Sequence, residues 1–460
     1  MTSKIKVRFA PSPTGHLHIG GVRTALFNYL YARNQNGEFF LRMEDTDRER
    51  SKEEFEKEII ASMKWLGLEW EGPVVHQTQR RKRYQECASQ LIQSGKAYRV
   101  DEITEAVKFR MPKEQIQFFD IIKGAIQFDT NLFDDLVILK SDGFPTYNFA
   151  CVVDDHDMEI SHVIRGEDHI SNTPRQIVMF RELGWQPPKY AHLPLILGSD
   201  GSPLSKRHGA VSLKAYEDAG FLPVGILNYL SLLGWGPGGN QEFFTQEELI
   251  KKFSLKRVNT TAAAFDPNKM RFINSLHLKQ MSSEEYLCEG KAFLVHKGLL
   301  EGKMKDVELN KILLLFRERI KTWRDLFREA DYCFEENITF DSEAIQKYFQ
   351  DSEVRPRLKA VLEEIKKSND FSATNLEKIV RGKAAEFGIE AASLIHPIRL
   401  AITGVSVSPS LFELMEVIGR EKVMKRIAFT VENFTNLPMK VKVEYETLKD
   451  DKEEDEAVDD

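Results

Sequence analysis

Residues 11–23 read PSPTGHLHIGGVR, and at this stretch the chain changes from a strand-like to a helix-like pattern. Before it, apolar and basic residues alternate with period two over residues 4–9, which predicts a strand. After it, residues 22–32 contain neither Gly nor Pro and predict a helix. A strand, a Pro- and Gly-rich loop and a helix are typical of the opening of a nucleotide-binding α/β domain, because free N–H groups at a helix start attract phosphate.

The loop places chemically useful residues at this expected helix start. An imidazole such as that of His18 can donate a hydrogen bond to a phosphate oxygen. Gly20 and Gly21 allow a base or a ribose to approach the backbone closely. His18 could instead simply cap the helix, but its position after a strand and a Pro-rich loop favours a contact with phosphate.

A second informative stretch, residues 198–209, reads GSDGSPLSKRHG. Its Gly, Ser, Asp and Pro residues predict a loop rich in turns. The cations of Lys206 and Arg207 and the hydroxyl of Ser205 suit a polyphosphate whose charge shifts during a reaction. A lone lysine is usually a surface residue, but the neighbours of Lys206 favour a catalytic role.

Together the two stretches resemble the two signature motifs of class I aminoacyl-tRNA synthetases. The forms PSPTG-x-LHIGG and LSKRHG resemble those of glutamyl-tRNA synthetases of the bacterial kind. The resemblance implies an α/β protein with a Rossmann-like class I catalytic domain that carries an inserted acceptor-binding segment, followed by an all-α anticodon-binding region. The implied divisions are a catalytic domain at 1–200 with its insertion at about 99–140, a stem-contact region at 201–305, a helical anticodon-binding region at 306–448 and an acidic tail at 449–460.

The same resemblance implies an ATP-dependent glutamate–tRNA ligase. Its substrates would be L-glutamate, ATP with Mg²⁺, and tRNA(Glu), and members of the family typically bind tRNA before they activate glutamate. His18 and Lys206 are the implied catalytic residues, which would stabilise charge on the phosphates. The implied ATP-binding residues are His18, Gly20, Gly21, Ser205, Lys206 and Arg207. Pro203 stands where the second motif commonly begins with lysine, so the loop has one cation fewer.

The resemblance also implies an amino-acid pocket. Its residues are Arg8, Ser12, Glu44, Tyr147 and Arg165. A guanidinium binds a carboxylate well, and Glu44 can pair with the substrate ammonium. Arg165 ends an apolar strand pattern, where a buried charge must be neutralised. The position at a strand end favours a ligand carboxylate, and Glu167 or Asp168 is the structural alternative.

Several patterns bear on metals. The run from Asp154 to Asp157 could be a metal cluster, but we favour turn and cap chemistry, since such side chains bond their own backbone. Many members of the family carry Cys and His ligands for zinc in the insertion. Residues 99–140 contain neither Cys nor His, so no zinc is predicted. The four cysteines are scattered without a CxxC pair, so the sequence indicates neither a disulfide framework nor a cysteine zinc site.

Composition restricts the class of protein. The scattered cysteines favour a reducing cytoplasm, and no apolar stretch is long enough to span a membrane. No charged-then-apolar leader precedes the first expected strand, so no signal peptide is predicted. The net charge of −7 argues against nucleic-acid binding, but the acidic run at 450–460 carries this charge. We expect that run to be disordered, and local basic faces elsewhere remain available to RNA.

The C-terminal half has helical spacing of apolar residues, for example over 309–326, 343–349 and 355–367. It resembles the anticodon-binding domain of bacterial glutamyl enzymes. That resemblance distinguishes the chain from glutaminyl enzymes, whose anticodon domains are β-barrels, and from truncated glutamyl-queuosine enzymes. A basic stretch near its start is either a solvated face or an RNA contact. This stretch contains Arg317, Arg319, Lys321 and Arg324.

Two other functions remain as alternatives. A nucleotidyltransferase with a small-molecule acceptor would use the same sheet but needs no helical C-terminal half. A non-catalytic RNA-binding relative predicts the loss of phosphate ligands, whereas His18, Lys206 and Arg207 are all present. We therefore expect a ligase, and a monomer is the family's usual state.

Overall fold

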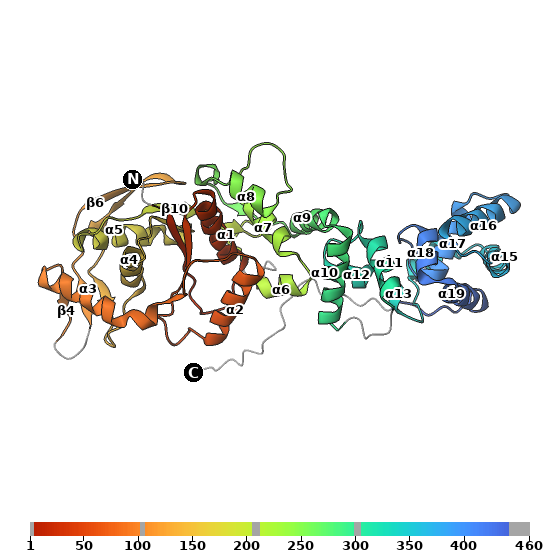
Figure 1. Cartoon of the computed structure of the whole chain (residues 1–460), viewed down its shortest axis with the longest axis horizontal. Helices are drawn as coiled ribbons and strands as arrows, with labels where there is room; N and C mark the ends of the chain where they lie inside the picture. Colours follow the sequence, from red (N-terminus) through yellow and green to blue (C-terminus); the bar gives the residue numbers. More distant parts are fainter. Residues whose placement is uncertain (1–3, 102–105, 205–211, 299–304, 441–460) are drawn as a thin grey trace. The chain divides into compact units, whose positions relative to one another are not determined.

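The computed structural model describes residues 4–101, 106–204, 212–298 and 305–440 (Figure 1). The chain folds as two compact units, one up to Asn274 and one from Ser275 onward, and the division falls within α9 (Pro267–Gln280). The expected acidic tail and the residues Ser205, Lys206 and Arg207 lie outside the described residues.

Parallel strands form the centre of the first unit. The first sheet has the order β1 (Lys6–Phe9), β2 (Glu38–Met43), β3 (Val75–His76). The second has the order β7 (Gly124–Asp129), β6 (Gln115–Asp120), β10 (Lys189–Leu193), β9 (His162–Gly166), and only β7 is antiparallel to its neighbour. Ser161 joins the two sheets, because its N–H donates to the carbonyl of Lys6 at 2.9 Å. Its hydroxyl also accepts from the N–H of Lys6.

This junction creates the reversal point of the sheet. From β1 the chain proceeds outward through β2 to β3, whereas β9 and β10 lie on the other side of β1. In open α/β sheets, ligands bind at the carboxyl ends of the strands where the order reverses. The fold therefore places a crevice next to the loop that follows β1.

Helix α1 (Ile19–Asn34) begins at the end of that loop. It packs against β1, β2 and β9, and also against α7 (Pro223–Leu232) and α8 (Gln246–Lys252) (Figure 1). Because the helix is covered on more than one side, its apolar residues are not confined to one stripe. The helix expected at 22–32 is present, and it extends beyond this range at both ends.

Four further helices of the first unit precede or follow its strands. They are α2 (Glu53–Trp65), α3 (Arg81–Gln93), α4 (Tyr147–Asp157) and α5 (Thr173–Glu182). Short 3-10 turns are η1 (Gln77–Arg80), η2 (Thr130–Leu132), η3 (Glu167–Asn172) and η5 (Leu255–Arg257). Pro174 lies in the first turn of α5, where its missing N–H costs nothing. Ser51 does not cap α2: the cap residue is Lys52, and acidic residues in the first turn supply the favourable charge instead.

The inserted segment contributes strands to two places. A small antiparallel sheet has the order β4 (Ala97–Arg99), β5 (Val107–Phe109), β8 (Leu136–Leu139). The hairpin of β6 and β7 instead extends the main sheet, since Asp120 pairs in register with Tyr190 of β10. The insertion is thus continuous with the strand that lies beside β9.

Two short strands and a helix complete the first unit. β11 (Ile196–Leu197) pairs with β12 (Ala263–Ala264), and α6 (Leu213–Asp218) follows the second signature stretch. Pro203 pairs with Leu197 across a tight turn in which Gly201 has φ +77°, a conformation that favours glycine.

All described elements of the second unit are helices. They are α10 (Ser283–His296), α11 (Asp306–Phe316), α12 (Trp323–Glu329), α13 (Asp331–Phe334), α14 (Ser342–Tyr348), α15 (Val354–Lys367), α16 (Ala373–Glu386), α17 (Ala392–Thr403), α18 (Leu411–Ile418) and α19 (Arg420–Glu432). The helix pattern at 309–326 corresponds to two helices, because Thr322 and Asp325 form a capping box that starts α12. Both helices bury apolar residues, which explains the continuous pattern.

Candidate active site

The carboxyl ends of three parallel strands bring together charged side chains that are far apart in the sequence. Arg8 lies in β1, Glu44 directly follows β2, and Arg165 lies near the end of β9. Their exposed fractions are only 3%, 6% and 5%. Tyr147 begins α4 close to all of them: burial raises the pKa of its hydroxyl, and Glu44, Arg165 and Arg8 act on it electrostatically. The structure therefore gathers four of the predicted amino-acid-binding residues at the reversal point of the sheet.

Arg165 is a buried cation without an ion-pair partner in the described part of the chain. Its Nη2 donates to the hydroxyl of Thr173 at 2.8 Å, whereas its Nη1 is buried and has no hydrogen-bond partner among the residues that the structure describes. Glu167 is instead bound by Lys123 and by the N–H of Leu195. The alternative in which Glu167 neutralises Arg165 is thus not observed.

Asp168 does not neutralise Arg165 either. Its carboxylate lies 3.4 Å from the imidazole of His169. Arg165 is therefore the cation of this crevice that still needs a counter-charge.

Arg8, in contrast, already has a carboxylate partner. Its Nε lies 3.0 Å from Oδ1 of Asp155, and its Nη2 lies 3.4 Å from Oδ2. Burial by itself would lower the pKa of Arg8, but the charge of Asp155 raises it overall. The expectation of turn and cap chemistry for Asp154 and Asp155 is wrong: both carboxylates are buried within α4 and bind arginines. Arg8 can therefore add hydrogen bonds to a ligand but little net charge.

Sequence reasoning missed Arg42, which is fully buried in β2. Its Nη1 donates to Asp155 at 2.6 Å, and its Nη2 donates to Glu44 at 3.0 Å. The thiol of Cys151 donates to the same oxygen of Glu44 at 3.1 Å. The carboxylate of Glu44 is therefore held in a fixed position. The available signal was a single arginine within the otherwise apolar run 39–43, directly before the acidic residues Glu44, Asp45 and Asp47.

The loop after β1 is arranged around His18. The residue is the N-cap of α1, and its Nδ1 accepts hydrogen bonds from the N–H groups of Gly20 at 3.1 Å and Gly21 at 3.3 Å. An acceptor role for Nδ1 places the ring proton on Nε2, so Nε2–H is a donor. Loss of water lowers the pKa of His18, which favours this neutral form, although Asp168 opposes the shift. The capping alternative is thus observed, and it leaves a donor for phosphate.

Steric contacts explain why glycine occupies positions 20 and 21 of this motif. A Cβ on Gly20 would lie 3.0 Å from Cε1 of the His18 ring. A Cβ on Gly21 would lie 2.9 Å from the side chain of Leu17. Ser12 is exposed in the same loop, where its carbonyl accepts from the N–H of Thr14.

The residues on either side of the second signature stretch are described and well anchored. On the entry side, the N–H of Leu204 donates to the carbonyl of Ile196 at 2.9 Å. On the exit side, the N–H of Leu213 donates to the carbonyl of Leu17 at 3.0 Å, and Ser212 forms a bridge with His18. The chain that carries Lys206 therefore ends directly beside the start of α1.

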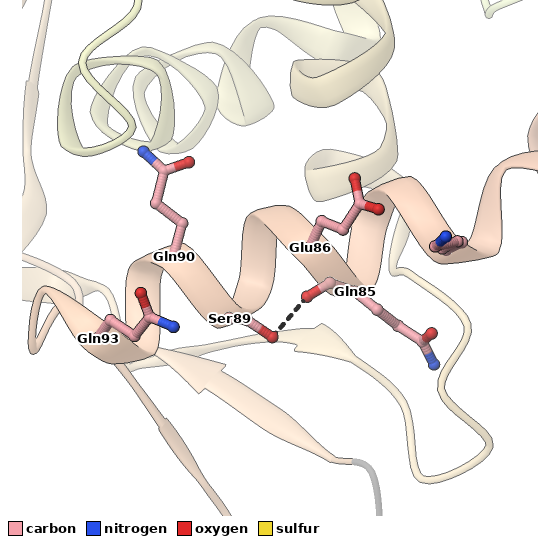
Figure 2. A pocket seen from close by; sticks show the side chains of 6 residues that line it. Gln85, Glu86, Ser89, Gln90 and Gln93 are labelled. Atoms are coloured by element: carbon pink, nitrogen blue, oxygen red, sulfur yellow. Dashed lines mark hydrogen bonds between the residues drawn. The ribbon is translucent and has the colours of Figure 1, made fainter.

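A hollow on the described surface lies away from this crevice. It has a volume of about 430 Å³ and is lined only by residues of α3 (Figure 2). These residues are Lys82, Gln85, Glu86, Ser89, Gln90 and Gln93. Because groups from different elements do not converge there, it lacks the construction of a ligand site. A second hollow, of about 230 Å³, borders the β1 loop at Pro13 and the acidic cluster at Asp45.

Two further properties concern the described residues as a set. No group of three or more His, Cys, Asp or Glu side chains among them is arranged to hold a metal ion. No helix in the described ranges is both long and apolar enough to cross a membrane.

Comparisons with known proteins match the whole architecture. The family model for the catalytic domain of class I tRNA synthetases (E and Q) matches residues 4–109 and 100–272, and that for an anticodon-binding domain matches residues 285–431. The expected fold class, a class I catalytic domain followed by a helical anticodon-binding region, is thereby confirmed.

Similar proteins cover nearly the full chain. Glutamate–tRNA ligase 2 of Caldicellulosiruptor saccharolyticus is 41% identical over 94% of this chain and 99% of its own length. Glutamate–tRNA ligase of Thermodesulfovibrio yellowstonii is 41% identical over 93% of this chain and 99% of its own length. The crystal structure of a glutamate tRNA ligase from Elizabethkingia meningosepticum in complex with its amino acid matches with a TM-score of 0.85 and 31% identity, covering 94% of this chain and 99% of that one. The chain therefore belongs to the glutamate–tRNA ligases, a family of class I aminoacyl-tRNA synthetases.

Proposed function

We propose that this chain joins L-glutamate to the 3′-terminal adenosine of tRNA(Glu) in two steps. A carboxylate oxygen of glutamate attacks the α-phosphorus of ATP, which forms glutamyl-adenylate and releases pyrophosphate. A ribose hydroxyl of the tRNA then attacks the carbonyl carbon and releases AMP. The observation that carries this proposal is Arg165, a buried cation whose Nη1 has no partner among the described residues, at the reversal point of the sheet.

The charges of the crevice suit glutamate, which has two carboxylates and one ammonium. Arg165 binds one carboxylate, because this pairing removes an uncompensated buried charge. Glu44 binds the ammonium through the carboxylate that Arg42 and Cys151 hold in place. Further hydrogen bonds come from Arg8, Ser12 and Tyr147. Arg8 contributes donors rather than net charge, since Asp155 already neutralises it.

The ATP site lies at the start of α1. Nε2–H of His18 donates to a phosphate oxygen, and the backbone at Gly20 and Gly21 lets the nucleotide approach. Ser205, Lys206 and Arg207 are assigned to the same phosphates because two cations and a hydroxyl suit a polyphosphate, and the described residue Ser212, which follows them in the chain, forms a bridge with His18. Mg²⁺ enters bound to the oxygens of ATP, and zinc has no part in the proposal.

The remaining parts of the chain serve the tRNA. Residues 99–140 contact its acceptor end, residues 201–305 its stem, and the helical region at 306–448 its anticodon. We propose that the enzyme acts in the cytoplasm as a monomer.

The first test is ATP-dependent charging of radiolabelled glutamate onto purified tRNA isoacceptors for glutamate and for glutamine. Charging of the glutamate isoacceptors supports the proposal, and additional charging of the glutamine isoacceptors reveals a relaxed choice of tRNA. If the folded enzyme charges neither, the proposal is refuted.

Two variants then test the assigned residues. Lys206→Ala should reduce the charging rate by about 10²-fold or more, because a cation that stabilises transition-state charge is lost. Arg165→Ala should raise the KM for glutamate by more than about tenfold and leave the KM for ATP nearly unchanged. Arg181→Ala is the matched control, since Arg181 is an exposed arginine of α5. An unchanged KM for glutamate in Arg165→Ala would exclude this pocket.

A further inference from the structure

A chain of buried hydrogen bonds lies behind Arg165. His192 of β10 and Asp120 of β6 are both completely buried. Nδ1 of His192 lies 2.6 Å from Oδ2 of Asp120, and Nε of Arg165 donates to Nε2 of His192 at 3.2 Å. Three strands that are adjacent in the sheet thus supply one connected series of side chains.

The protonation of His192 follows from its neighbours. Its Nδ1 carries the proton, because Asp120 is a carboxylate that only accepts, and its Nε2 therefore offers a lone pair to Arg165. Asp120 is fixed in turn, since it also accepts from the N–H groups of Ile122 and Lys123. This arrangement holds one edge of the guanidinium through Nε.

The rest of the guanidinium is only partly bound. Nη2 is held by the hydroxyl of Thr173 at 2.8 Å. Nη1 has no partner among the described residues, so it is the group that remains for a ligand. We propose that His192, fixed by Asp120, is a positioning residue that holds Arg165 with Nη1 open to a carboxylate of glutamate. This inference rests on the proposed role of Arg165 in binding glutamate.

The arrangement makes recognition of glutamate depend on the charge of His192. The groups that face it are Asp120 of β6, Arg165 of β9, His169 of η3, the ring of Tyr190 on its own strand and the hydroxyl of Thr173, which lies 3.1 Å from Nε2. Burial lowers the pKa of His192, the bond to Asp120 opposes that shift, and Arg165 lowers the pKa further. The ring is therefore neutral at physiological pH. Protonation at low pH would remove the acceptor and place a second cation beside Arg165.

Two substitutions separate the two ring nitrogens. In His192→Asn, the side-chain amide can still reach Asp120 but offers no acceptor at the position of Nε2. In His192→Gln, the longer amide can place its oxygen near that position and accept from Arg165. We expect His192→Asn to raise the KM for glutamate about tenfold, with little change in the KM for ATP. We expect His192→Gln to recover most of the loss.

His162→Asn is the matched control. His162 is also a buried imidazole of the sheet, but its contacts are Tyr31 and Ser161, away from the crevice. The measurement is tRNA charging at varied glutamate and at varied ATP, with thermal melting of each variant. The control should leave both KM values unchanged.

The outcomes distinguish this inference from the proposed function. If Arg165→Ala raises the KM for glutamate but His192→Asn does not, the positioning role is overturned and the pocket stands. If neither variant raises it, the role of Arg165 in the proposed function fails as well.

If His192→Asn has a lower Tm than the wild type, a pH profile tests the positioning role of His192 instead. For the wild type, kcat/KM for glutamate should fall with decreasing pH more steeply than kcat/KM for ATP. In His192→Gln this difference should vanish, because the glutamine side chain does not titrate. If kcat/KM for glutamate falls equally steeply with decreasing pH in the wild type and in His192→Gln, the inference is overturned.

Discussion

Replacing Asp155 by asparagine removes the carboxylate that two buried arginines share. Oδ1 of Asp155 lies 3.0 Å from Nε of Arg8 and 2.6 Å from Nη1 of Arg42. After the substitution, Arg42 still has Glu44 as an ion-pair partner at 3.0 Å, whereas Arg8 has no second ion-pair partner among the described residues. The substitution therefore leaves one guanidinium that is only 3% exposed without a counter-charge.

The expected loss of stability follows from that unpaired charge. Removing one partner of a buried ion pair costs about 3–5 kcal/mol, and we expect the lower end because the asparagine oxygen remains a neutral acceptor. About 3 kcal/mol corresponds to a decrease in Tm of roughly 6–12 °C for a unit of this size. Asp157→Asn is the matched control on the same helix: its side chain is 21% exposed, so its pairs with Arg83 and Arg80 should contribute only about 1 kcal/mol.

The effect has a defined dependence on pH. Burial by itself would raise the pKa of Asp155, but Arg8 and Arg42 lower it below its ordinary value. A depressed pKa in the folded state stabilises the protein above the unfolded-state pKa of about 3.9, and that stabilisation is lost as the pH falls through the folded-state pKa. The difference in Tm between the wild type and Asp155→Asn should thus persist from about pH 5 to about pH 8 and disappear only in strong acid. Thermal melting followed by circular dichroism measures it. Equal Tm values for Asp155→Asn and Asp157→Asn would refute the reasoning.

Two other predictions concern single positions. In His18→Asn, asparagine is also a good N-cap, so the Tm should stay close to that of the wild type, while loss of Nε2–H should lower the charging rate by about 10²-fold; full activity would remove His18 from the mechanism. Gly404→Ala should destabilise the protein by more than about 1 kcal/mol, because Gly404 has φ +76° and its Cβ would lie 1.9 Å from the carbonyl oxygen of Thr339. Gly382 is in an open position within α16, so Gly382→Ala should stabilise the protein by about 0.5–1 kcal/mol. Thermal melting measures both variants, and a Tm that changes in the same direction in both would contradict the steric explanation.

Local patterns predicted the elements that form the crevice. The strand, loop and helix around residues 11–23 could be assigned from periodicity and from Pro and Gly, because these properties act over a few neighbouring residues. Where several local solutions were possible, the assignment was less accurate: the pattern over 309–326 predicted a continuous helical stretch, but Thr322 and Asp325 start a second helix there.

The sequence by itself determined the family motifs, the α/β beginning, the helical second half and the residue types of the pocket. Only the tertiary structure decided how their charges are paired. Arg8 and Asp155 are 147 positions apart, and Asp120 and His192 are 72 positions apart, so no local pattern links them. Asp120 and His192 meet because β6 and β10 are neighbours in the sheet, whereas Arg8 of β1 meets Asp155 because helix α4 buries that carboxylate beside the strand. That tertiary arrangement neutralises Arg8 and leaves Arg165 with a donor that has no partner among the described residues, since the pairing of buried charges depends on which strands and helices become neighbours.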